Sequence, residues 1–311
     1  MQKIFPKLYF LILALCLFPF FTAPLALFLG IVFAFFYKGA PILKTGALAK
    51  YLLQASVVCM GFGMSLPEVI QTGKTGFGIT FASIFFTLFA GIVLARLFKV
   101  ESVTGQLIAG GTAICGGSAI AAFGSVLNAK ENQMSFALAV VFVLNAVGLF
   151  IFPIIGHLLE MEQVHFGYWA AIAIHDTSSV VGACETYGQE ALQVGTTVKL
   201  TRTLWIIPVA LLLAYYNKNK TAKISIPWFI LFFIFAILIS NFAPEYISGM
   251  EETNQHLSWL GRKGMIISLF LIGSSIKAED VKKTGLNAFA LGISLWIIVS
   301  VATLFWIKSI F

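Results

Sequence analysis

Polar residues that could do chemistry interrupt the apolar runs of this chain at three places. The first is the run 109–122, AGGTAICGGSAIAA, whose two glycine pairs weaken a helix by about 1 kcal/mol per glycine relative to alanine. A helix that breaks there presents backbone amides and a positive half-helix end, which together can bind an anion. The alternative is that these small residues serve only close helix packing. The candidate anion ligands in this run are Thr112, Cys115, Gly116, Gly117 and Ser118.

The second stretch places five polar residues, 175–179, between two apolar runs. An ionisable residue inside a membrane span usually faces a cavity and takes part in function. His175 is of a type that titrates near neutral pH, and Asp176 beside it can shift its pKa, so this pair is predicted to carry or gate a coupling proton. Thr177 and Ser178 are predicted to contact the substrate. The alternative is a self-satisfied polar cluster that only holds helices together.

The third stretch contains Lys199 and Arg202, which are three residues apart and therefore share one face of a helix. A guanidinium group is a planar fork of donors that suits a carboxylate, a sulfonate or sulfate. Both cations are predicted to bind the anion. Two alternatives stay open: an ion pair with Asp176 or Glu185, or a shorter span that leaves both cations at the membrane interface.

The amino-acid composition indicates whether the chain lies in water or in a lipid bilayer. Hydrophobic residues make up 59% of the 311 and charged residues 11%, whereas soluble domains have about 45–50% and about 25%. So few charges cannot cover a water-soluble surface, so the chain is predicted to lie in a lipid bilayer. Backbone at membrane depth must satisfy its own hydrogen bonds, so an all-α polytopic membrane protein is expected.

Eleven apolar segments are predicted to be membrane helices, for which about 20 mostly apolar residues suffice. The first two are short, so ten spans is the alternative. The segments are 7–21, 24–37, 47–66, 76–97, 104–127, 133–157, 166–187, 190–216, 225–241, 257–276 and 286–309.

The formal charge of +7 is distributed over short connections between these segments, where it sets membrane orientation. The N-terminus is predicted to be cytoplasmic because most lysines and arginines then fall inside. Nothing resembles a nucleic-acid surface, and four cysteines without a CxxC pair predict neither a metal nor a cofactor. The residues predicted to lie inside are Lys3, Lys7, Lys38, Lys44, Arg96, Lys99, Lys218, Lys220, Lys223, Lys277, Lys282 and Lys283.

A shift of 212 residues aligns a segment with a second one near the C-terminus: Gly61 with Gly273, Glu68 with Asp280, Val69 with Val281, Thr72 with Thr284 and Gly73 with Gly285. Inverted repeats are typical of secondary transporters. We therefore expect one transmembrane domain over 1–311, with repeat-related segments of about 47–157 and 166–309, the second rearranged as an open alternative.

The motifs ICGGSAIAA (114–122), IHDTSSVVGA (174–183) and VKLTR (198–202) occur in one chain in this order. The combination closely resembles the bacterial putative sulfate exporter family over essentially the whole chain. The resemblance implies a bacterial inner-membrane protein, and export as the direction of transport.

A looser resemblance links residues 56–157 to bile acid:sodium symporter-like carriers. That fold has a panel bundle, a core bundle and two discontinuous helices that cross at mid-membrane. The resemblance implies that 104–127 is one of them and that either 166–187 or 190–216 is the other. Segments 104–127 and 166–187 run the same way in the predicted topology, so the choice stays open.

Together these features predict a secondary active transporter of a small anion, such as a sulfur oxyanion, a sulfonate or a carboxylate, and not an enzyme. Alternating access around a mid-membrane site is expected, with H⁺ or Na⁺ as the coupling ion and a homodimer as an open alternative. Two other functions stay open: an anion channel, and an intramembrane hydrolase that uses Ser118 and His175.

Overall fold

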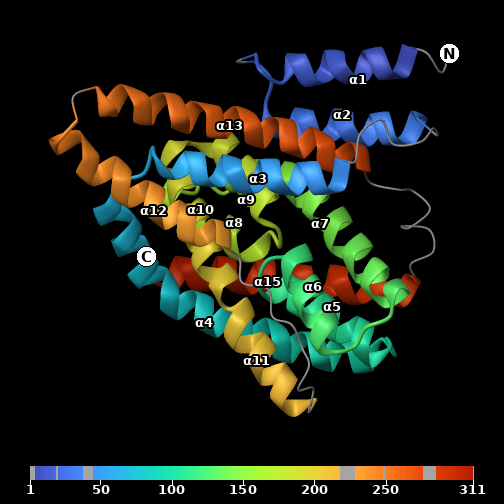
Figure 1. Ribbon diagram of the computed structural model, residues 1–311. Helices are drawn as coiled ribbons and strands as arrows, with labels where there is room; N and C mark the ends of the chain where they lie inside the picture. The colour runs from blue at the N-terminus through green and yellow to red at the C-terminus, as the bar shows by residue number, and fades with distance from the viewer. Residues whose placement is uncertain are drawn as a thin grey trace. The chain divides into compact units, whose positions relative to one another are not determined.

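The computed structural model describes residues 4–18, 20–37, 45–217, 228–247, 249–275 and 285–310. Within these ranges the secondary structure is helical, without a strand (Figure 1). The prediction of an all-α protein is therefore confirmed. Most of the lysines used to predict a cytoplasmic N-terminus lie outside the described residues. The repeat positions Asp280, Val281 and Thr284 also lie outside them.

The chain divides into two compact units, of which the first comprises Met1–Ile70 and Trp228–Ala278. Each predicted apolar segment of this unit corresponds to one helix. Its elements are α1 (Ile4–Leu15), α2 (Ala23–Phe36), α3 (Thr45–Gly61), α12 (Trp228–Phe242), the short 3-10 turn η1 (Ala243–Glu245) and α13 (Met250–Ser275).

Close backbone contacts hold α13 against α2 and α3. A Cβ on Gly273 would lie 2.6 Å from the carbonyl oxygen of Leu27 in α2, so a larger residue would push the helices apart. Gly264 approaches Ser56, and Gly261 approaches Met60, so α13 runs antiparallel to α3. One aligned pair of the predicted repeat, Gly61 and Gly273, lies in these two helices, and the repeat itself stays a prediction.

The second unit comprises Gln71–Pro227 and Glu279–Phe311 and contains all three polar stretches. Its elements are most of α4 (Leu66–Leu97), then α5 (Ser102–Ala113), α6 (Gly117–Val126), α7 (Glu131–Leu158), α8 (Gln163–Ala173), α9 (Thr177–Tyr187), α10 (Gln189–Leu204), α11 (Ile206–Tyr216) and α15 (Leu286–Ile310). The expectation that 1–311 forms a single domain stays a prediction.

Two segments of the second unit break in the middle and fold back as helical hairpins, which we call hairpin 1 (α5–α6) and hairpin 2 (α8–α9). In hairpin 1 a Cβ on Gly110 would lie 2.2 Å from the ring of Phe123. In hairpin 2 the rings of Phe166 and Tyr187 stack with centroids 3.7 Å apart. Residues far from each break therefore meet, which requires antiparallel halves. The predicted discontinuity is confirmed, and the reversal of direction is an addition to it.

Helix α7 connects the base of hairpin 1 to the base of hairpin 2. It has 28 residues, about 42 Å at 1.5 Å per residue. The hairpins consequently start at opposite ends of a helix long enough to cross a bilayer. This arrangement removes the conflict in direction between segments 104–127 and 166–187, because hairpins from opposite ends point toward each other.

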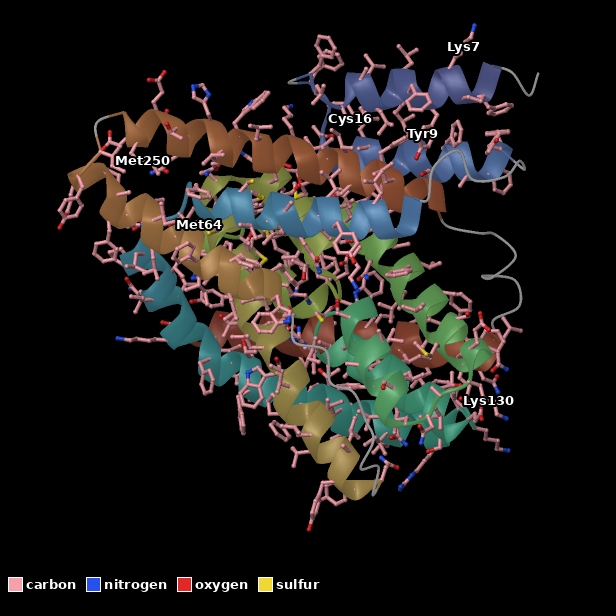
Figure 2. All side chains as sticks on the ribbon, in the orientation of Figure 1. Lys7, Tyr9, Cys16, Met64, Lys130 and Met250 are labelled. Carbon is pink, nitrogen blue, oxygen red and sulfur yellow. The ribbon has the colours of Figure 1, made fainter. Side chains whose placement is uncertain are left out.

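A glutamine closes each hairpin base. At the base of hairpin 1, where Figure 2 labels Lys130, the Gln133 side chain accepts from the Lys130 amide at 2.7 Å and donates to Glu101. At the base of hairpin 2, the Gln163 side chain accepts from the amides of Glu190 and Ala191 at 3.0 and 3.4 Å. Each glutamine thus ties the start of a hairpin to the helix that follows it.

Helix length distinguishes the hairpins from the spans. Helices α5, α6, α8 and α9 have 12, 10, 11 and 11 residues. At 1.5 Å per residue they are about 15–18 Å long, roughly half of a hydrocarbon core of about 30 Å. Among the described residues, five helical stretches are long and apolar enough to cross a membrane: Leu66–Leu97, Glu131–Leu158, Gln189–Tyr216, Trp228–Glu245 and Leu286–Ser309.

Candidate functional site

The tips of the two hairpins meet beside the middle of α7. A Cβ on Gly116 would lie 3.4 Å from the Cβ of Asp176, so the two breaks are neighbours. The same position lies 3.3 Å from Val141, and the side-chain oxygen of Asn145 accepts from the His175 amide at 3.0 Å. Val141 and Asn145 occupy the central turns of α7. The tips therefore lie half-way along a helix long enough to span the bilayer.

Arg202 satisfies the carbonyl end of α5. The last four carbonyls of a helix have no partner within the helix. Backbone amides of the tip bond those of Gly110 and Gly111. The Arg202 guanidinium donates to the other two, with Nε 2.5 Å from the Ala113 oxygen and Nη2 3.4 Å from the Thr112 oxygen.

Lys199 and Arg202 together satisfy most of the carbonyl end of α8. The Lys199 ammonium donates to Ala171 at 3.2 Å and to Ile174 at 2.7 Å. Arg202 Nη1 donates to Ala171 at 3.3 Å and also to Ile172. One guanidinium therefore joins the broken ends of both hairpins. Segment 166–187 is thereby shown to be the partner of segment 104–127, a choice that the sequence left open.

Both cations are fully buried, with 0% of their surface exposed. Protein surrounds both side chains, and the alternative that they lie at the depth of the membrane interface stays untested. Their hydrogen bonds in the described residues go to backbone carbonyls, which carry the negative end of the helix dipole. The prediction that they bind the anion directly is not tested, but in this structure they cap helices.

The amide end of α9 is occupied by a carboxylate of the chain itself. Asp176 accepts from the backbone amides of Ser178 and Ser179 at 3.2 and 3.1 Å. The hydroxyl groups of both serines also donate to this carboxylate. Asp176 is thus an N-cap, and it shows how a negative group binds to a hairpin tip.

The amide end of α6 has no side-chain cap. Its N-cap residue is Gly116, which has no side chain and whose φ of 62° lies in the region that favours glycine. Gly117 and Ser118 follow as the first two helical residues, and their amides have no partner within a helix. Ser118 is exposed and Gly117 partly so. The first turn of α6 is therefore partly exposed.

All the residues predicted for the site lie at the two tips or on α10, within the second unit. Thr112, Cys115 and Thr177 are buried, and Asp176 is partly exposed. His175 is fully buried, and among the described residues neither of its ring nitrogens has a hydrogen-bond partner. The Ser118–His175 pair that a hydrolase would use is therefore not formed in this structure.

Two residues that hold hairpin 2 in place were missed as site residues. Asn145 reads as an ordinary helix contact in the sequence, yet its side chain positions the His175 amide. The indole of Trp296 in α15 donates to Ala173 at 3.1 Å and so completes the carbonyl end of α8. A tryptophan inside an apolar span needs a hydrogen-bond acceptor for its indole N–H. This requirement is the sequence feature from which a contact of Trp296 could have been predicted.

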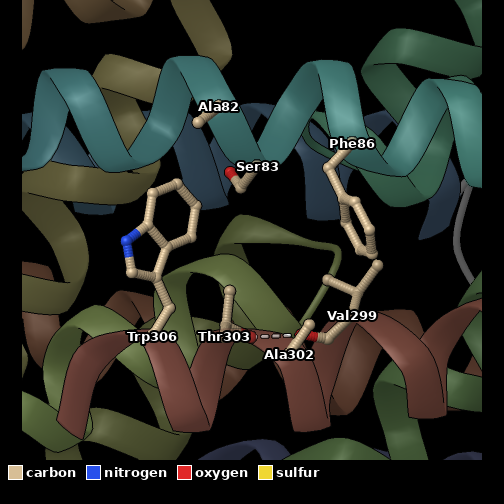
Figure 3. Close-up of a pocket in the computed structure, with 7 residues that line it drawn as sticks. All are labelled: Ala82, Ser83, Phe86, Val299, Ala302, Thr303 and Trp306. Carbon is tan, nitrogen blue, oxygen red and sulfur yellow. Dashed lines mark hydrogen bonds between the residues drawn. The ribbon is translucent and has the colours of Figure 1, made fainter. Parts of the chain in front are cut away.

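An apolar pocket of about 380 Å³ lies apart from these residues, between α4 and α15 (Figure 3). Its lining offers two hydroxyl groups, and both already donate to their own helix: Ser83 to Thr80 at 2.9 Å, and Thr303 to Val299. Neither hydroxyl is therefore a free donor, and the other polar group of the lining is the indole N–H of Trp306. In the described residues no group of His, Cys, Asp and Glu is arranged to hold a metal ion.

The fold and this site define a polytopic α-helical membrane protein in which two opposed hairpins meet. The chain matches the family model described as conserved hypothetical protein 698 over residues 19–292. A UPF0324 membrane protein of Photobacterium profundum is 48% identical over 301 residues, covering 97% of this chain and 91% of the relative. The chain therefore belongs to this family of membrane proteins.

Other relatives agree. A UPF0324 membrane protein of Bacteroides thetaiotaomicron is 48% identical over 287 residues, covering 92% of this chain and 86% of the relative. One from Vibrio parahaemolyticus is 43% identical over 302 residues, with 96% of both chains covered. No solved structure matches. These names place the chain in a membrane and say nothing of a substrate.

We expect Arg202→Met to destabilise the protein strongly, because it removes the guanidinium that joins both hairpins. Each buried carbonyl left unpaired costs about 1–3 kcal/mol. Arg202→Lys should recover only part of the loss, since an ammonium cannot fork between two helix ends. The measurement is the apparent Tm of the detergent-purified protein.

Arg96→Met is the matched control, because Arg96 is exposed in the last turn of α4. It should leave the apparent Tm nearly unchanged. Equal Tm values for Arg202→Met and Arg96→Met would show that the carbonyl ends do not depend on Arg202.

Proposed function

We propose that this protein is a secondary active transporter of a small anion, with the anion bound at the amide end of α6. The observation that carries the proposal is the contrast between two helix ends. The amides of α9 hold the carboxylate of Asp176, whereas the N-cap residue of α6 is a glycine, which has no side chain to cap the helix. A carboxylate, a sulfonate or a sulfur oxyanion offers α6 the same oxygen acceptors that Asp176 offers α9.

Charge balance at the tips supports an anion. Each helix end carries about half a charge, so the two carbonyl ends and the two amide ends of the hairpins roughly cancel. Lys199 and Arg202 add two positive charges, and Asp176 adds one negative charge. About one positive charge therefore remains. Burying an unpaired charge is costly, and an anion at α6 removes that cost.

The role that we propose for the two cations is different from the direct anion contact predicted from the sequence. Lys199 and Arg202 already bond backbone carbonyls, so they act on the anion through their charge and by holding the tips together. Direct contact with the anion falls to the amides of Gly117 and Ser118. This division leaves both helix polarities satisfied: cations at the carbonyl ends and anions at the amide ends.

The transport cycle we propose is alternating access around the hairpin tips. The tips lie beside the centre of α7, and the chain has two compact units that provide two bodies for relative movement. Location in the bacterial inner membrane with a cytoplasmic N-terminus, and export as the direction, remain part of the proposal. They rest on the charge pattern and on the resemblance of the three motifs.

Asp176 is the group we propose for proton coupling. An anion at α6 lies close to Asp176, since Gly116 is its neighbour. A monoanion balances the remaining charge while Asp176 is ionised. A dianion such as sulfate reaches balance only if Asp176 takes up a proton, because two negative groups at close range disfavour one another. His175 suits this role less, because among the described residues an imidazolium there has no acceptor for either ring N–H.

We expect Gly117→Pro to weaken the response to anions strongly, while Gly117→Ala retains it. Proline removes the amide at the first helical position but is otherwise tolerated there. A Cβ at Gly117 meets only side-chain atoms, the nearest 3.3 Å away on Phe142. Loss of one hydrogen bond to a charged group, about 1.5–3 kcal/mol, weakens binding roughly 10- to 100-fold.

The measurement is the thermal shift of purified protein against sulfate, sulfite, sulfonates and small carboxylates, followed by counterflow of the active anion in proteoliposomes. A channel would show flux without counterflow exchange. If Gly117→Pro responds to the anion as strongly as Gly117→Ala, then the anion does not bind at α6.

We expect sulfate to bind more tightly as pH falls, because its binding carries one proton to Asp176. The apparent affinity should rise by up to about tenfold per pH unit for one proton taken up. Asp176→Asn should make the affinity for sulfate independent of pH, and asparagine still caps α9 with its amide oxygen. An unchanged pH slope in this variant would exclude Asp176 as the proton carrier.

A further inference from the structure

The carbonyl ends of α5 and α8 have the chemistry of a cation site. In transporters with broken helices, exposed carbonyls at half-helix ends coordinate Na⁺. Here two such ends converge, and each has carbonyl oxygens that no backbone amide uses. The cations that reach these oxygens belong to the chain itself, on a single turn of α10.

We propose that Lys199 and Arg202 are permanent internal cations that occupy the place of a coupling Na⁺. The site as it stands therefore takes no free metal ion. Lys199→Ala would vacate the part formed by the oxygens of Ala171 and Ile174, which then accepts a small monovalent cation such as Na⁺ or methylammonium. The consequence for transport, that the cycle runs without Na⁺, rests on the proposed function, whereas the binding statement does not.

Three observations carry this inference. The Lys199 ammonium lies 2.7 and 3.2 Å from two carbonyl oxygens, which is the distance of full hydrogen bonds. Its exposed fraction is 0%, so no solvent shares its charge. Both oxygens belong to the carbonyl end of α8, which carries the negative end of the helix dipole and so attracts a positive occupant.

Two unbonded hydroxyls add to the oxygen chemistry of the same region. In the described residues, the side chains of Thr112 and Thr196 are buried without a hydrogen-bond partner. Thr112 belongs to the last turn of α5, and Thr196 lies one helical turn before Lys199. Hard cations prefer oxygen ligands of both kinds, so this region of the second unit has the chemistry of a cation site.

The first experiment compares the apparent Tm of the wild-type protein in NaCl, KCl and choline chloride at equal ionic strength. We expect equal values in the three salts. A saturable upward shift that only Na⁺ produces would overturn the inference, because it would show a free Na⁺ bound to the native state. This arm needs no variant and no transported substrate.

The second experiment uses Lys199→Ala. We expect a lower apparent Tm in choline and a saturable recovery with methylammonium or Na⁺, because choline is too large for the vacated space. Lys263→Ala is the matched control: Lys263 is also buried, but among the described residues its ammonium reaches the single carbonyl of Phe18. Its apparent Tm should fall without a difference between the cations.

A folded Lys199→Ala protein whose Tm is the same in methylammonium, Na⁺ and choline would overturn the inference. If this variant does not fold, Lys199→Gln replaces it, because the amide group keeps donors for the two carbonyls without a charge. That variant should fold, and the wild-type comparison still decides whether Na⁺ binds.

The third experiment measures anion counterflow by the wild type with Na⁺ or choline on both sides of the membrane. We expect rates equal within about twofold, which is less than 0.5 kcal/mol at 1.4 kcal/mol per tenfold change. A strict requirement for Na⁺ would overturn the inference. Absence of any counterflow would contradict the proposed function alone, since both Tm comparisons report on the cation site without transport.

Discussion

The contact between the Arg202 guanidinium and the carbonyl ends of α5 and α8 is the interaction on which the second unit depends. Broken helices leave orphan carbonyls, and at membrane depth no water is available to satisfy them. The chain solves this with two cations placed one turn apart on α10, supplemented by the indole of Trp296. The hairpins, their meeting point and the charge at that point all follow from this solution.

The same contact places the carbonyl ends of the hairpin helices on one side and their amide ends on the other. Carbonyl ends face the cations, and amide ends face the side on which Asp176 is partly exposed and Ser118 exposed. One amide end holds a carboxylate of the chain, and the other is uncapped. A function in anion binding therefore needs no extra charged ligand. In the proposed transporter, the buried cations hold the geometry, while backbone amides would make the contact that a departing substrate releases.

Sequence reasoning located the breaks but not their shape. The glycine pairs of 109–122 and the polar run after Ile174 marked both interruptions. Glycine weakens a helix, and polar side chains inside a membrane span are costly. A straight break and a hairpin have the same composition, and they differ in contacts such as that between Gly110 and Phe123. The hydrogen-bond partners of Lys199 could not be predicted from the sequence either. They are backbone carbonyls, which every residue has, and no residue type shows which carbonyl lacks a backbone partner.

The most direct test of the anion site is a structure of the protein with selenate, an oxyanion whose position anomalous scattering reveals. The peak is expected within hydrogen-bond distance of the Gly117 and Ser118 amides, with Lys199 and Arg202 still bonded to the carbonyl ends of the hairpins. A peak bonded to the Arg202 guanidinium, with the carbonyls of Ala113 and Ile172 released, would contradict the account.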